Sequence, residues 1–280
     1  MLGLIYRGLL LFFKNKQAVV GSLIGALIMV LLYVFLLGEN LVEQLEMLEN
    51  PQLLVDTWML AGVIGISSAS ATLGSVSLMI RDKERQVYTD FMISPLSKPG
   101  ITLGYFFSTY LISLIITIVM IIVSEIYIVF VSQGSLLSIT DFFLLLLASS
   151  LSILCSSAMM FCVASFFRRI DTFSTMTGII GPLVGFLTGC YIPIGGLPEL
   201  AQQVIKYFPL TSGIVLIRQI MTKQVFVTEK PEVVTEIKNQ LGITLNLSHE
   251  VLIPMLILVL TSCLFLSIAA WNVKQTEMTR

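Results

Sequence analysis

The sequence predicts an all-α integral membrane protein. Three observations predict this fold class: the composition, the length of the apolar stretches and the distribution of the basic residues. The chain has 280 residues, of which 56% are hydrophobic and 12% are charged, whereas an ordinary soluble domain carries about 25% charged residues. A soluble protein of this size has too little interior to hide so much apolar surface. With 16 basic and 17 acidic residues, the chain also lacks the positive excess typical of nucleic-acid-binding proteins.

Six stretches are long and apolar enough to cross a bilayer, whose hydrocarbon core requires about 20 apolar residues in a helix. They are residues 18–37, 58–80, 101–131, 142–167, 173–191 and 251–271. The fifth is the shortest and the richest in glycine. The first is too long for a cleavable signal peptide and lacks a small-residue cleavage site, so it is interpreted as a membrane anchor.

Basic residues occur in every second segment between these spans, which predicts the topology. They are Arg7, Lys14 and Lys16 before the first span, Arg81, Lys83, Arg85 and Lys98 after the second, Arg168 and Arg169 after the fourth, and Lys274 and Arg280 after the sixth. Residues 38–57 and 132–141 contain no Lys or Arg. We therefore expect a multi-pass protein of the plasma membrane with both termini in the cytoplasm.

The chain is expected to form a single transmembrane domain, residues 1–280. Its predicted parts are an interfacial helix (1–17), spans one to five (18–191), an external loop (192–250), the sixth span (251–271) and a cytoplasmic tail (272–280). In the first part, Gly3, Arg7 and Lys14 share one stripe of a helical wheel and apolar residues cover the rest, which favours a helix lying at the cytoplasmic interface. The alternative is a plain extension of the first span.

The loop after the second span, residues 81–100, predicts a short cytoplasmic helix. Val87, Tyr88, Phe91 and Met92 form one apolar face, and Glu84, Arg85 and Asp90 are available for polar contacts. Pro95, Pro99 and Gly100 end the segment. Such a face is expected to dock on a partner, and the alternative is packing against its own bundle or the lipid headgroups.

The external loop begins with two short apolar segments that are interrupted by proline. Pro193, Pro198 and Pro209 break the chain, and Arg218 lies in the second segment. Neither segment is long enough to span, so both are expected to lie at or dip into the outer leaflet, backed by protein. Residues 222–250 are more polar and are expected to form a small external lobe.

Small residues recur at every fourth position in several spans, which lets helix backbones approach closely in lipid. The series are Gly181, Gly185 and Gly189 in the fifth span, Gly21 and Gly25 in the first, and in the second the two separate pairs Ala61 and Gly65, then Ser70 and Gly74. Such series indicate packing within a chain or between chains, and the pattern does not distinguish the two.

Few residues in the spans point to chemistry. Glu125 is the only charged residue inside a predicted span, near its outer end, and a role in transport or coupling is one interpretation of it. The four cysteines lie in apolar runs without metal spacing, and the chain has a single histidine. A phosphate-binding loop of the form GxxxxGK[ST] and a GxSxG elbow are both absent from the sequence. We therefore expect a protein that is not itself an enzyme.

Several motifs resemble those of the permease subunits of type-2 ATP-binding-cassette exporters, including drug and antibiotic exporters. Asp82-Lys83-Glu84-Arg85 and Ile93-Ser94-Pro95-Leu96-Ser97 match the two ends of a family motif, in which Gln86-Val87 replace a Gly-Thr pair. Gly189 to Pro193, Leu197-Pro198 and Phe208-Pro209-Leu210-Thr211 look like a second motif after the fifth span, with Arg218 following. The resemblance covers the whole chain.

The resemblance implies a mechanism. Two permease chains, identical or related, would associate with separate ATPase subunits that bind ATP and Mg, so no cofactor is expected on this chain. The ATPase-coupling residues would be Glu84, Arg85, Val87, Tyr88, Asp90, Phe91, Met92 and Pro95. The packing residues at the dimer or pathway would be Gly21, Gly25, Gly181, Gly185 and Gly189, and the outer gate would contain Pro193, Pro198, Phe208, Pro209 and Arg218.

The expected substrate is amphipathic, drug-like or lipid-like, because the interior is uncharged and rich in Ser, Thr, Met and Phe. The expected partners are therefore the ATPase subunits, a second permease chain and membrane lipid. The alternative function is an ion-coupled carrier, or a membrane scaffold, that lacks an ATPase partner.

Overall fold

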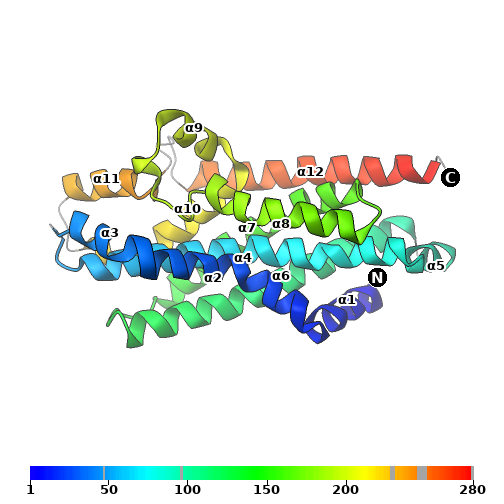
Figure 1. Ribbon diagram of the computed structural model, residues 1–280, viewed down its shortest axis with the longest axis horizontal. Coiled ribbons are helices and arrows are strands. Elements are labelled where there is room, and N and C mark those ends of the chain that lie inside the picture. Colours follow the sequence, from blue (N-terminus) through cyan, green and yellow to red (C-terminus); the bar gives the residue numbers. More distant parts are fainter. Residues whose placement is uncertain (47, 95–96, 228–230, 245–250, 279–280) are drawn as a thin grey trace.

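The computed structural model is a bundle of long helices that run side by side (Figure 1). It describes residues 1–280 except 47, 95–96, 228–230, 245–250 and 279–280. The first helices are α1 (Leu2–Lys14), α2 (Lys16–Leu32), the π-helical segment η1 (Tyr33–Leu37), α3 (Gly38–Gln44), α4 (Pro51–Glu84), α5 (Val87–Ile93) and α6 (Lys98–Phe130). They are followed by α7 (Ile139–Ser165), α8 (Ile170–Leu187), the 3-10 turn η2 (Ile194–Gly196), α9 (Glu199–Tyr207), α10 (Pro209–Thr222), the 3-10 turn η3 (Val225–Val227), α11 (Pro231–Gln240) and α12 (Leu252–Met278).

The all-α membrane fold with six spans is confirmed. In the described part of the chain, six helices have the length and the apolar composition to cross a membrane, and the pair α9 and α10 would make a seventh if it counts as one broken span. Those six are Lys16–Gln44, Pro51–Glu84, Pro99–Phe130, Ile139–Ser165, Ile170–Leu187 and Leu252–Asn272. Most are longer than the predicted stretches, because a helix continues into the polar headgroup layer after its apolar segment ends.

The second span, α4, is the centre of the bundle. It packs against α2, α6, α7, α8 and α10, and 78% of its most apolar window is buried, against 17% for the corresponding window of α8. Small residues allow this close packing: a Cβ placed on Gly65 would come within 2.6 Å of the Ile214 side chain in α10. The spans α2, α8 and α12 lie at the periphery, and most of their surface faces away from the bundle.

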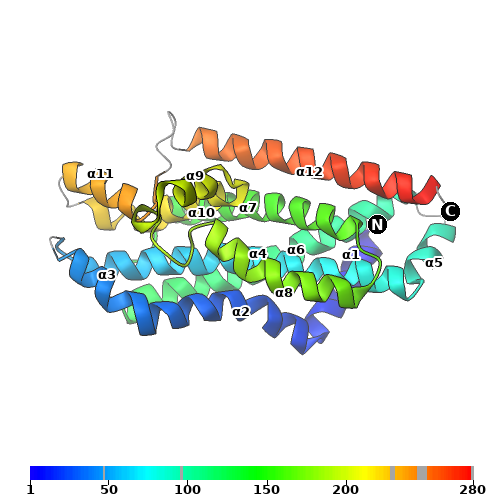
Figure 2. The same ribbon diagram turned by 45° about the horizontal axis from the view of Figure 1, so that its top comes forward.

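The chain ends and the short helix α5 lie at one end of the bundle, as an even number of spans requires. Figure 1 shows α1, α5 and the last turns of α12 at this end. Figure 2 shows α3 and α11 at the opposite end. Along its long axis the molecule therefore has two ends. We call the end with α5 the terminal end and the end with α9, α10 and α11 the lobe end.

Candidate functional site

A partly buried ion pair joins three helices at the terminal end. Arg7 of α1 donates hydrogen bonds of 2.6 Å and 2.9 Å to the two carboxylate oxygens of Asp82 in α4, and the Tyr105 hydroxyl of α6 donates to Asp82 at 2.7 Å. The Asp82 side chain is only 4% exposed. The hydrogen bond to Asp82 raises the pKa of the Arg7 guanidinium above its ordinary value. A two-point contact of this kind fixes orientation as well as distance, so α1 is held in a defined position on α4.

The prediction for α1 is modified by this contact. The helix forms, but Arg7 points into the bundle towards Asp82. The buried residues Leu4, Ile5, Gly8 and Phe12 face the same way, while Leu2 and Tyr6 are exposed. The reason is that Asp82 offers Arg7 a full ionic partner, which is a stronger attraction than the hydrated interface.

Helix α5 lies on this ion pair, with its aromatic side chains turned inwards. The Tyr88 ring stacks on the Tyr105 ring at a centroid distance of 6.1 Å, and the Arg7 guanidinium lies 5.4 Å from the centre of the Phe91 ring. Val87 and Met92 are half-buried on the same side. In the single chain this face therefore packs in part on its own bundle, and docking of the segment on a partner stays a prediction. The physical reason is that only Arg85 and Gln86 separate α5 from α4, so the short helix folds its apolar face onto its neighbours.

The outward surface formed by the end of α4, the turn after it and α5 is mostly polar. Glu84, Arg85 and Asp90 are exposed, and Ile93 adds one apolar side chain that is 82% exposed. Gln86 adopts a left-handed conformation with φ of 62°, the backbone shape that glycine adopts without strain. Pro95, which the sequence also assigned to coupling, lies outside the described residues.

At the lobe end, Arg218 of α10 is fully buried and joins separate segments. Its guanidinium lies 4.5 Å from the centre of the Trp58 ring of α4 and donates to the carbonyl oxygens of Gly189 at 2.8 Å and of Leu241 and Gly242 at 3.4 Å. The Trp58 indole N–H also donates to the Leu241 carbonyl at 2.8 Å. The carbonyls at the ends of α8 and α11 carry partial negative charge, so Arg218 is neutralised by backbone dipoles.

The other residues assigned to an outer gate lie at the breaks between the short elements of the lobe. Pro193 and Pro198 flank η2 and the start of α9, and Phe208 and Pro209 form the joint between α9 and α10. The two helices meet at 89°, because proline cannot continue the preceding helix. On α9 only Ile205 is buried, whereas Leu200 and Tyr207 are about four-fifths exposed.

Two buried carboxylates near the lobe end have neutral partners. Asp56 accepts hydrogen bonds from Tyr33, Gln52 and Ser132 and is 1% exposed. Glu125 accepts one from the Leu137 amide at 3.2 Å, and its other oxygen has no hydrogen-bond partner. Asp56 lies just before the predicted second span, because the apolar stretch begins only at Trp58. The spacing of Gln52 and Asp56, one helical turn apart, was the available signal.

The glycine series divides into a packed part and an open part. A Cβ at Gly185 would collide with the Tyr191 ring, and one at Gly189, where φ is +63°, would lie 2.6 Å from Ile194. A Cβ at Gly25 would lie 2.7 Å from the Ser70 hydroxyl oxygen of α4. Gly21 meets nothing within 4 Å, and Gly181 meets only Leu73, at 4.0 Å. The packing at Gly185, Gly189 and Gly25 is therefore within the chain, while Gly21 and Gly181 border open space.

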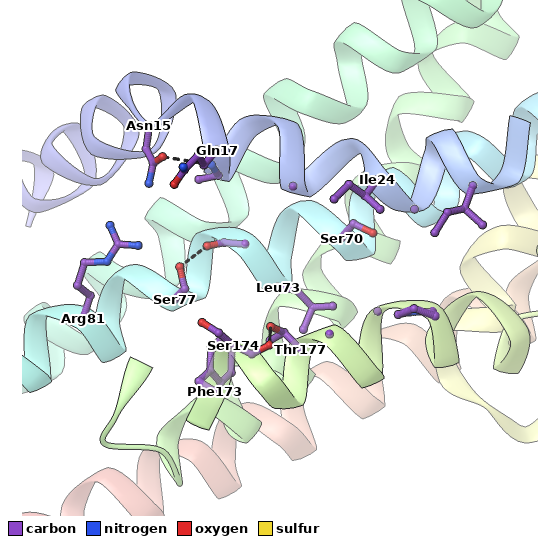
Figure 3. A pocket seen from close by; sticks show the side chains of 18 of the residues that line it. Asn15, Gln17, Ile24, Ser70, Leu73, Ser77, Arg81, Phe173, Ser174 and Thr177 are labelled. Carbon is purple, nitrogen blue, oxygen red and sulfur yellow. Dashed lines mark hydrogen bonds between the residues drawn. The ribbon is translucent and has the colours of Figure 1, made fainter. Parts of the chain in front are cut away.

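That open space is a groove of about 450 Å³ between α2, α4 and α8 (Figure 3). Its lining residues are Asn15, Gln17, Ala18, Gly21, Ile24, Gly25, Ile28, Ser70, Leu73, Gly74, Ser77, Arg81, Phe173, Ser174, Thr177, Gly178, Gly181, Pro182 and Tyr191. A volume of this size is within the usual range for small-molecule sites. The groove is therefore the principal candidate for ligand binding in the described part of the chain.

Taken together, the fold and these contacts define a multi-pass α-helical membrane protein with a central helix and a short helix presented at one end. The family model described as "ABC-2 family transporter protein" matches residues 40–271. The chain belongs to this ABC-2 family, and it is a membrane subunit of an ABC transporter. Membrane subunits of this family generally pair with ATP-binding-cassette ATPases. A search of curated proteins found no match.

Proposed function

We propose that the chain is the membrane-spanning subunit of an ATP-driven exporter. It would move an amphipathic, drug-like or lipid-like molecule out of the cytoplasm or the inner leaflet, while separate ATPase subunits bind ATP and Mg. Family membership and the six-span fold support this function. In this proposal the terminal end of the bundle faces the cytoplasm of a cell whose plasma membrane holds the protein.

The contact of α5 with α1, α4 and α6 is the observation that carries the proposal. Tyr88 and Phe91 join α5 to Tyr105 and Arg7, and both of these residues contact Asp82 of the central helix. A force applied to α5 is therefore transmitted directly to α4, which packs against most of the other spans. The family resemblance implied coupling by the same segment, and we propose two roles for its residues according to whether they face the bundle or the solvent.

The outward residues Glu84, Arg85, Asp90 and Ile93 would contact the ATPase. The inward residues Val87, Tyr88, Phe91 and Met92 would carry the movement into the bundle. A largely polar docking surface suits a subunit that also exists apart from its partner, because an exposed apolar face of the same size would favour aggregation.

A second permease chain, identical or related, would complete the transporter. The peripheral spans α2 and α8 are the candidates for this contact, because they are apolar and little buried within one chain. The joint between α9 and α10, with the Arg218 contacts beside it, would close the pathway at the outer end.

The proposal is tested by isolating the tagged chain from its own membrane and assaying the complex for ATP hydrolysis. An ATPase subunit is expected to co-purify. Asp90→Arg reverses a charge on the outward face of α5 and is expected to reduce co-purification at least about fivefold, since it places a repulsive charge in the interface. Glu43→Arg makes the same charge change on exposed α3, at the opposite end of the molecule, and serves as the control. Equal recovery of the ATPase with both variants would contradict the assignment of α5.

The alternative function, an ion-coupled carrier or a scaffold, rests on Glu125 and its one unpartnered oxygen. Substrate transport that continues in vesicles containing this chain alone, and that is lost in Glu125→Gln, would favour it. Transport that requires the ATPase subunit and persists in Glu125→Gln favours the exporter.

A further inference from the structure

The groove between α2, α4 and α8 has different chemistry along its length. Asn15 and Gln17 at the start of α2, Ser77 and Arg81 of α4, and Ser174 of α8 gather at the end near α1 (Figure 3). The remaining walls are mainly glycine and aliphatic side chains, among them Ile24, Ile28 and Leu73. The groove therefore offers a polar end and an apolar body, which matches an amphiphilic molecule.

Among the described residues that line the groove, only Arg81 is charged. Its side chain is half-buried, and in the described structure its guanidinium has no hydrogen bond or ion pair. Figure 3 shows the guanidinium at one end of the groove, on the side of Asn15. Removing a cation from water without giving it a partner is costly, and an anionic group bound there would supply a charge-assisted hydrogen bond.

A second polar group that lines the groove also lacks a partner. Tyr191 is 1% exposed, and its hydroxyl has no hydrogen-bond partner in the described structure. Buried hydroxyl groups are normally hydrogen-bonded. Of these two groups, the Arg81 guanidinium at the polar end of the groove is the one that a bound ligand would pair with, because the Tyr191 hydroxyl is enclosed in the wall.

The dimensions fit an elongated ligand. Ser70 and Arg81 line the groove from the same helix, and their separation of eleven positions corresponds to a rise of about 16 Å along the helix. Gly21, Gly178 and Gly181 widen the groove, because no side chain projects from these positions; a Cβ at Gly178 would meet nothing within 4 Å. A single acyl chain can lie along such a surface.

We propose that this groove binds an anionic amphiphile with one acyl chain, whose carboxylate or phosphate pairs with Arg81 while the chain lies along the glycine-lined walls. The inference rests on the proposed function in one respect: the bound molecule would be a substrate of the exporter, loaded from the inner leaflet. Binding itself requires only this chain.

The test is equilibrium binding of radiolabelled myristate to the full chain in nanodiscs of phosphatidylcholine, with competition by unlabelled myristate, tetradecyl phosphate or tetradecanol. Both anions are expected to compete about tenfold more strongly than the alcohol, because only they pair with Arg81. Arg81→Gln is expected to abolish this preference, and Arg81→Lys to retain most of it. Arg85→Gln removes an exposed cation one turn further along and is expected to leave the preference unchanged.

A second variant tests the position of the acyl chain. Gly181→Leu fills the groove and is expected to weaken binding of all three ligands, with unchanged thermal unfolding as the check that the chain still folds. Any of three results would overturn the proposal. They are equal competition by acid and alcohol in the unchanged chain, an equal loss of the preference for anions in Arg81→Gln and Arg85→Gln, and unaltered binding in Gly181→Leu. A second chain that contacts the outer faces of α2 and α8 would leave the groove between them open to myristate. Efficient cross-linking of two Gly181→Cys chains that excess myristate does not reduce would overturn the proposal in favour of a second copy in the groove.

These outcomes are separate from those for the proposed function. A chain that recovers an active ATPase but shows no preference for anions remains an exporter subunit with a different substrate. A chain that binds myristate through Arg81 but recovers no ATPase retains the binding site and loses the exporter assignment.

Discussion

At the scale of single residues, buried polar groups at the two ends of α4 organise the protein. Asp82 at the terminal end is paired with Arg7, whereas Arg218 at the lobe end is held by backbone carbonyls and the Trp58 ring. Neither arrangement is visible in composition, because the partners are far apart in the sequence: Arg7 and Asp82 are separated by 75 positions. Hydropathy predicted where the helices run but not which polar atoms would meet between them.

The buried arginine gives the first prediction. Arg218→Met removes the donors for three carbonyl groups and the cation above Trp58, and is expected to lower the free energy of unfolding by about 3 kcal/mol. Arg218→Lys keeps the charge but not the forked donors, so its loss is expected to be smaller. Unfolding of the purified protein in mixed detergent micelles measures both.

Arg168→Met provides the control, because Arg168 is exposed, and such a change is expected to alter stability by less than about 0.5 kcal/mol. If Arg218→Met and Arg168→Met unfold alike, Arg218 does not hold the lobe.

At the scale of elements, the sequence predicted α5 and its apolar face but not the direction in which that face points. Periodicity shows which side chains share a face, and it contains no information on whether a neighbouring element or a partner covers that face. The spacing of glycines has the same limitation. Gly185 and Gly181 look equivalent in the sequence, yet one is packed and the other borders the groove.

The turn between α4 and α5 gives the second prediction. Gln86 has φ of 62°, a conformation that costs a residue with a side chain about 1–2 kcal/mol. Gln86→Gly removes this cost, but glycine also makes the unfolded chain more flexible. The net expectation is that the free energy of unfolding rises by about 0.5–1 kcal/mol. Gln133, with φ of 53°, is expected to respond in the same direction. The measurement is the midpoint of thermal unfolding.

Gln203→Gly supplies the matched control, because Gln203 is exposed within helix α9, where glycine costs about 0.5–1 kcal/mol. A loss of stability in Gln86→Gly of the same size as in Gln203→Gly would show that the left-handed turn is not strained.

At the scale of the whole molecule, α4 is the only helix in the described structure that contributes both to the Asp82 contacts and to the Trp58 contacts. Its ends lie at opposite ends of the bundle (Figure 1), and its sides contact α2, α6, α7, α8 and α10 among others. The groove opens along the same helix, from Ser70 to Arg81. A small displacement of α4 would therefore reach the α5 surface, the groove and the lobe together, as an alternating transporter requires.

The third prediction tests this connection. Asp82→Asn removes the ionic partner of Arg7 and is expected to loosen α1 and α5 from α4, because the remaining amide oxygen accepts a weaker hydrogen bond from the guanidinium. In the complex with its ATPase, we expect substrate transported per ATP hydrolysed to fall several-fold while ATP hydrolysis itself continues. Hydrogen exchange of the α1 amides, measured alongside, should show faster opening.

The double variant Arg7→Gln with Asp82→Asn separates loss of the contact from damage to the fold. If the pair acts through its mutual interaction, the two changes together are expected to cost less than the sum of the single changes, with a coupling energy of about 1–3 kcal/mol. Transport per ATP should then recover in part, because no unpaired charge remains between α1 and α4. Simple additivity of the single effects, or an unchanged transport ratio in Asp82→Asn, would show that force from α5 reaches the bundle by another route.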